Sequence, residues 1–139
     1  MSYEEKGQWV YLAATSIAYG AYLVLLLGSA GGTPLTELEY RPFLLWTIGA
    51  AVVGSIIGRI AIEIVRPSDS HQEDVRDREI GRFGEYVSGM ILGVGMVGPF
   101  ILVLVEADLF WIANAMYLVF VVQAVIGTII KLIAYRRGF

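Results

Sequence analysis

The sequence predicts an all-α, polytopic membrane protein with four transmembrane helices, and three observations lead to this fold class. Of the 139 residues, 57% are hydrophobic and only 17% are charged, and the mean hydropathy is +0.67. Soluble domains are nearer to half apolar and about a quarter charged. Four apolar runs are each long enough to cross a bilayer, which takes about 20 helical residues. These runs cover residues 9–28, 43–65, 83–105 and 109–133. We therefore expect residues 1–139 to form a single integral membrane domain.

Positive charge is distributed unevenly about the predicted bilayer. Nine of the ten Lys and Arg residues fall on the side that holds both termini and the loop at 66–82, whereas Arg41 falls on the other side. Loops rich in Lys and Arg stay in the cytoplasm during membrane insertion. We expect both termini and this loop to be cytoplasmic.

The two halves of the chain match each other at a shift of about 73 residues. The segment VGSII at 53–57 falls on IGTII at 126–130, and the repeat extends over about 5–66 and 79–137. Each half holds two helices, so both halves enter the membrane from the same side. We therefore expect parallel repeats, built as two helical hairpins about a pseudo-two-fold axis along the membrane normal.

The segment GVGMVG at 93–98 has the glycine spacing of a dinucleotide-binding loop. That loop works as a turn between a strand and a helix, where backbone amides meet a pyrophosphate. Here the pattern lies inside an apolar run with no strand before it, so we expect the glycines to serve helix packing instead. The residues expected in such contacts are Gly54, Gly58, Gly81, Gly84, Ser88, Gly89, Gly93, Gly95 and Gly98.

Helical periodicity gives the third run two small-residue faces. Gly84, Ser88 and Gly95 share one face, while Gly89 and Gly93 lie on another. Two such faces exceed the need of a four-helix bundle, so we expect a homo-oligomer, most simply a dimer. Alternatively, both faces serve internal packing. Pro99 predicts a kink near the outer end of this helix.

Polar side chains inside predicted spans are costly, so each is a candidate functional residue. The candidates are Gln123, Asn114, Arg59, Glu63 and Glu85. Gln123 is the deepest, and it either lines a path or forms an interhelical hydrogen bond worth about 1 kcal/mol. Arg59 and Glu63, spaced i,i+4, predict a salt bridge or a gate, and Glu85 is placed to join Arg59 at the cytoplasmic mouth. Asn114 lies on the opposite face of its helix from Gln123.

The sequence contains no recognisable catalytic set, and we expect no enzyme activity and no cofactor. It has no cysteine and one histidine, His71, whose spacing from nearby carboxylates matches no known metal site. The lack of a deep lone carboxylate also argues against a small proton-coupled exporter. We expect no bound metal and no nucleic-acid partner.

The segment DVRDREI at 74–80 is densely charged and is expected to begin the third helix. Its pattern Asp-x-Arg-Asp-Arg-x-Ile resembles that of an uncharacterised family of small four-helix prokaryotic membrane proteins, whose members usually carry an acidic residue in place of Val75. The resemblance implies a multi-pass protein of a prokaryotic inner (plasma) membrane, and it implies no activity.

Two hypotheses for function follow. The first is a non-enzymatic interaction, sensor or anchoring module that meets a cytoplasmic protein partner through Asp74, Arg76, Asp77 and Arg78. The alternative is a small channel or transporter with a path between the repeats or between subunits. Access of water to the interior near Gln123 distinguishes the two.

Overall fold

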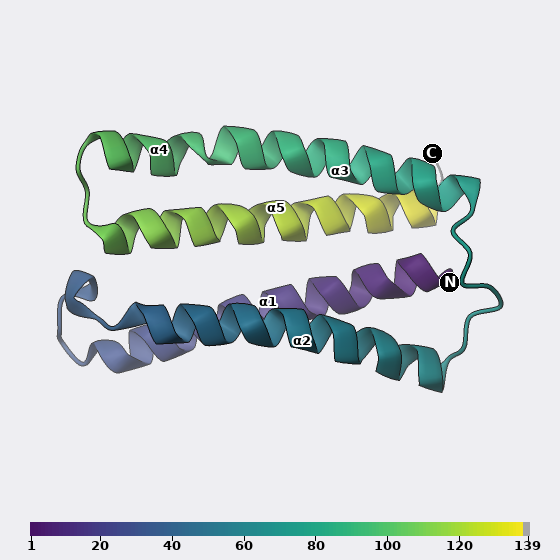
Figure 1. Ribbon diagram of the computed structural model, residues 1–139, viewed down its shortest axis with the longest axis horizontal. Helices are drawn as coiled ribbons and strands as arrows, with labels where there is room; N and C mark the ends of the chain where they lie inside the picture. Colours follow the sequence, from purple (N-terminus) through teal and green to yellow (C-terminus); the bar gives the residue numbers. More distant parts are fainter. Residues whose placement is uncertain (138–139) are drawn as a thin grey trace.

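The computed structural model describes residues 1–137, and the regular structure in this range is helical throughout (Figure 1). The elements are α1 (Tyr3–Ala30), the short 3-10 helix η1 (Leu35–Glu37), α2 (Tyr40–Val65), α3 (Val75–Gly95), α4 (Val97–Leu104) and α5 (Leu109–Arg137). Four segments are long and apolar enough to cross a membrane: α1, α2, α3 together with α4, and α5. The all-α fold class with four transmembrane-length segments is therefore confirmed, and the protein is a multi-pass membrane protein.

The helices α1 and α3 begin earlier than their apolar runs because polar residues cap them. The Ser2 hydroxyl accepts a hydrogen bond from the backbone N–H of Glu5 at 3.1 Å and so starts α1. Asp74 and Asp77 form a reciprocal capping box at the start of α3, in which each carboxylate accepts from the other's backbone N–H. Caps of this kind satisfy backbone donors that have no partner within the helix. The charged segment after the loop is thus the first turn of α3.

The third span is interrupted at Met96, which separates α3 from α4. Pro99 has no backbone N–H and cannot donate to the carbonyl of Gly95, and its ring crowds that carbonyl. The interruption falls where Pro99 predicts a kink.

The helices pack as an open row rather than a closed bundle. The helix α1 packs against both α2 and α5, and α3 packs against the other side of α5, while α2 and α3 make no comparable contact within residues 1–137 (Figure 1). A two-fold axis would pair α2 with α3 in the same way as α1 with α5. The contacts between the hairpins therefore differ from the expected two-fold arrangement, because polar side chains line a cavity where α2 and α3 would meet.

Glycines bring the helices of each hairpin close together. A Cβ added at Gly84, Gly127 or Gly95 would overlap the side chain of Lys131, Ser88 or Val119, respectively, across the contact between α3 and α5. Between α1 and α2, Gly58 lies against Val10 and Gly7 against Arg59. The remaining glycines predicted to pack have no such neighbour within 4 Å in the described chain, and they are Gly54, Gly81, Gly89, Gly93 and Gly98.

Gly95→Val is expected to destabilise the protein by about 1–3 kcal/mol, because the new side chain must displace Val119, a stiff β-branched residue. The control is Gly49→Val on α2, where no neighbour lies within 4 Å of a new Cβ. Thermal unfolding of the purified variants in detergent measures both effects. Equal destabilisation by the two variants would contradict the packing role of Gly95.

Candidate functional site

A polar cavity of about 440 Å³ lies between the two hairpins, in the half of the molecule where α1 begins and α5 ends. All four membrane-crossing segments contribute to its wall. The polar lining residues are Gln8 and Tyr11 of α1, Ser55 and Arg59 of α2, Glu85 and Ser88 of α3, and Gln123, Thr128 and Lys131 of α5. A cavity with this many polar groups is unusual in a membrane-spanning segment, where such groups are costly unless they have a use.

Three of the five polar residues singled out from the sequence line this one cavity. Gln123, Arg59 and Glu85 come from three different helices, and the row of helices brings them to a common wall. Glu63 and Asn114 lie elsewhere, in contacts that hold the fold. Lys131 also lines the cavity, although the sequence analysis assigned it only to the side of the membrane that is rich in Lys and Arg.

The charges of the cavity are incompletely neutralised. Arg59 donates to Glu4 at 2.6 Å and lies 4.2 Å from the ring centre of Tyr3, but its buried Nε has no hydrogen-bond partner. Neither Lys131 nor Glu85 makes a hydrogen bond or salt bridge to any part of the described chain. The cavity therefore presents Lys131 and Glu85 without partners in the described chain, together with Arg59, whose charge is paired with that of Glu4.

Glycines place both cations at the wall. Arg59 lies against Gly7 and Lys131 lies against Gly84, and in each case a Cβ on the glycine would crowd the cationic side chain. The long apolar stems of Arg and Lys can run along a helix surface while the charged end reaches a polar site. The small residues of α1 and α3 thus leave room for the side chains that give the cavity its charge.

The opposite half of the molecule is closed by aromatic packing. Tyr22 is fully buried and packs with Phe110, Tyr117, Leu26 and Val121. The Tyr22 hydroxyl donates to Asn114 at 2.6 Å, which gives Asn114 a structural contact, and Tyr22 and Tyr117 meet edge to face at 5.1 Å. Edge-to-face pairs add to the stability gained from burial alone. The polar cavity therefore has a closed end.

Glu63 anchors the start of the connecting loop. Its carboxylate lies 3.5 Å from the Lys6 ammonium, accepts from the backbone N–H of Ser68 at 2.6 Å, and lies 2.9 Å from His71 Nε2. Lys6, which is only 6% exposed, also donates to the carbonyl of Arg66. His71 thus belongs to this cluster, and residues 1–137 contain no group of three or more side chains placed to hold a metal ion.

The charged segment at the end of the loop is largely occupied by contacts within the chain. Asp77, 6% exposed, accepts from the hydroxyls of Ser2 at 3.1 Å and Tyr135 at 2.8 Å. Arg76 donates to the carbonyl of Tyr135 at 2.6 Å, and Asp74 caps α3. These residues tie the amino terminus and α5 to the start of α3.

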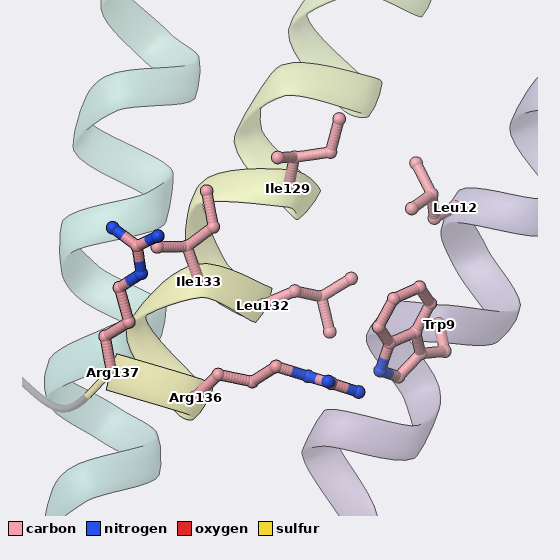
Figure 2. Close-up of a pocket in the computed structure, with 7 residues that line it drawn as sticks. All are labelled: Trp9, Leu12, Ile129, Leu132, Ile133, Arg136 and Arg137. Carbon is pink, nitrogen blue, oxygen red and sulfur yellow. The ribbon is translucent and has the colours of Figure 1, made fainter.

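A smaller cavity of about 350 Å³ lies between α1 and α5 near the same end (Figure 2). Its wall is apolar apart from two arginines and the indole N–H of Trp9. Figure 2 shows Arg136 directed toward Trp9, with its guanidinium 5.6 Å from the ring centre, and Arg137 directed away from it. The two cations do not converge on one point, as they would in an anion site. The arrangement is typical of residues at a membrane interface.

No protein-family model, no curated protein and no solved structure matches this chain. The family resemblance of the segment at 74–80 therefore stays a prediction, and the site is interpreted from its own geometry.

Asp77→Ala is expected to lower the free energy of unfolding by about 1–3 kcal/mol, because it leaves the hydroxyls of Ser2 and Tyr135 and the backbone N–H of Asp74 without their acceptor. Asp69→Ala, in the exposed part of the same loop, is the matched control. Thermal unfolding in detergent, together with proteolysis at 66–74, measures the change. A loss no greater than that of the control would show that Asp77 does not hold the loop.

Proposed function

We propose that the protein is a small, non-enzymatic membrane transporter or channel that admits a ligand into the cavity between its two hairpins. The observation that carries the proposal is the convergence of Arg59, Glu85, Gln123 and Lys131 on one intramembrane cavity. Permeation pathways through membranes are built from polar groups that face a cavity between helices. Lys131, a cation without a partner in the described chain, favours a ligand that carries an anionic group.

The aromatic cluster at the far end would serve as the gate. Its barrier is apolar packing, with side-chain hydrogen bonds from Tyr22 to Asn114 and between Tyr117 and Thr47. Interhelical hydrogen bonds in membranes are worth only about 1 kcal/mol each. Rocking of one hairpin against the other along the contact between α1 and α5 would open this end, as in transporters that move repeats as rigid bodies.

The hypothesis of a docking module receives less support from the contacts of the loop. Asp74, Arg76 and Asp77, three of the four residues proposed to meet a partner, are engaged within the chain. Arg78 is exposed and has no such contact with the described residues 1–137. Asp74, Arg76 and Arg78 are exposed, but the contacts of Asp74 and Arg76 within the chain already give these two residues a structural role, so transport is the function that we put forward.

The orientation that we propose places both termini in the cytoplasm of a prokaryote, because positive charge gathers at that end of the molecule. The polar cavity then lies in the cytoplasmic half of the protein, and the aromatic cluster lies on the outer side. In this orientation the ligand is taken up from the cytoplasmic side.

The accessibility of Gln123 tests the proposed path. In Gln123→Cys, a charged, membrane-impermeant thiol reagent applied to vesicles should label the new cysteine, which is the only one in the chain. Leu118→Cys, on the same helix and 46% exposed to the surroundings of the bundle, should stay unlabelled because a charged reagent does not enter hydrocarbon. Ser70→Cys in the loop reports which side the reagent reaches. Labelling at 70 without labelling at 123 would count against a water-accessible path.

We also propose a homodimer through the outer face of α3, where Gly89 and Gly93 have no neighbour within 4 Å in the described chain. Helices associate in membranes where small residues allow close approach. Gly89→Leu combined with Gly93→Leu should shift the protein from dimer to monomer in light scattering of the detergent-solubilised sample. Gly20→Leu combined with Gly28→Leu on α1 is the matched control, and equal behaviour of both pairs would exclude this interface.

A further inference from the structure

A second cavity, of about 520 Å³, adjoins the polar one. It lies between α1, α2 and α5 and has a mainly apolar wall that includes Ile48, Val52 and Phe120. The two cavities share five lining residues, which are Tyr11, Ser55, Ile56, Gln123 and Ala124. Together they form one cleft that is cationic toward the ends of α2 and α5 and apolar toward the middle of the membrane.

We propose that this amphipathic cleft binds a phospholipid with an anionic head group, drawn from the surrounding leaflet. The head-group phosphate meets Lys131 and Arg59, and one acyl chain occupies the apolar part beside Val52 and Phe120. The inference rests on the proposed function, because it uses the same cavity and names the class of ligand. Both volumes lie within the range of about 300–1,000 Å³ that is typical of ligand sites.

The two cations lie at the depth of a head group. Lys131 lies six residues before the end of α5 at Arg137, and Arg59 lies six residues before the end of α2 at Val65. At 1.5 Å of rise per residue, both are about 9 Å inside the helix ends. The side chains start from the same level of the bilayer and both line the polar cavity, so the proposed phosphate lies between them.

The hydrogen-bonding capacity left over at the cations matches a phosphate. Arg59 donates to Glu4 through Nη2 and has no other acceptor among residues 1–137, its buried Nε included, and Lys131 has no partner there. A buried donor without a partner needs an explanation in a native structure. Phosphate oxygens accept strong hydrogen bonds from both guanidinium and ammonium groups, and basic pockets between transmembrane helices bind anionic head groups.

The open side of the cleft favours a lipid over a soluble anion. The helices α2 and α3 both line the polar cavity without packing on each other, so a ligand can enter sideways between them. Phe120 and Val52, in the apolar part, are 47% and 57% exposed and would face lipid chains. A soluble anion would contact the polar part alone, whereas one lipid molecule would contact both parts.

The head group, rather than the acyl chain, sets the affinity. A lipid tail is already in hydrocarbon, so moving it into an apolar cleft gains little. Selectivity then depends on the charges of the cavity, and Glu85 opposes the two cations. Two substitutions should therefore change the affinity in opposite directions. Removing the charge of Lys131 weakens binding of an anionic lipid, and neutralising Glu85 strengthens it.

Binding of radiolabelled phosphatidylglycerol to the purified full-length protein in neutral-detergent micelles tests the proposal. Lys131→Met should weaken binding at least tenfold, Lys131→Arg should retain it, and Glu85→Gln should strengthen it. Arg137→Met is the control, because it removes a cation from the same helix outside the cleft. Phosphatidylcholine should compete poorly.

Unchanged binding in Lys131→Met, or equal competition by phosphatidylcholine, would overturn the proposal. Displacement by millimolar inorganic phosphate would identify a soluble anion as the ligand and overturn the lipid source. Labelling of Gln123→Cys separates this inference from the proposed function. A labelled protein that binds no anionic lipid would still support a water-accessible path and would contradict only the lipid proposal. An unlabelled protein that binds no lipid would contradict both proposals.

Discussion

The structure depends on the close approach of glycines to side chains on the neighbouring helix. Inside a membrane, apolar side chains gain nothing by leaving lipid for each other, so helices associate where backbones come near enough for dense packing. Gly95 against Val119 and Gly127 against Ser88 supply this in the second hairpin. Gly7 and Gly84 do more, because the side chains that lie over them are Arg59 and Lys131. The same packing that joins the helices therefore carries charge to the cavity.

The open row of helices turns these contacts into a site. If α2 packed along α3, Arg59 and Glu85 would need partners from each other's helix or would be excluded from the interior. Instead α1 and α5 pack against each other between α2 and α3. The polar side chains of α2 and α3 therefore line a cavity that neither helix fills. At the closed end the rings of Tyr22 and Tyr117 fill the space between the helices, and their hydroxyls form hydrogen bonds with Asn114 and Thr47.

Composition and run length predicted the fold class, because crossing hydrocarbon imposes a length and an apolar content that any sequence reveals. The bounds of the helices were harder to predict from the sequence. Helix α3 begins at Val75, ahead of its apolar run, because Asp74 and Asp77 form a capping box at its start. Arg59, Glu85 and Gln123 could be singled out one by one, since each is polar within a span. Their convergence could not be predicted, because it depends on which helix faces meet. Lys131 was missed as a site residue because it lies near the end of an apolar run. A lysine at such a position normally helps to set the orientation of the helix in the membrane.

The predicted repeat would give a physical reason for the asymmetry of the cavity. Under the shift of 73 to 74 residues, Val10 corresponds to Gly84 and Gly58 corresponds to Lys131. Both pairs are in contact, but the glycine lies on α2 in the first hairpin and on α3 in the second. When the glycine moves from one helix of a hairpin to the other, the two helices can still approach closely. The long side chain is then carried by the helix that lacks the glycine. An exchange of this kind would let a duplicated hairpin acquire Lys131 without loss of packing, and would add to the cavity a cation that has no counterpart at Gly58 in the first hairpin.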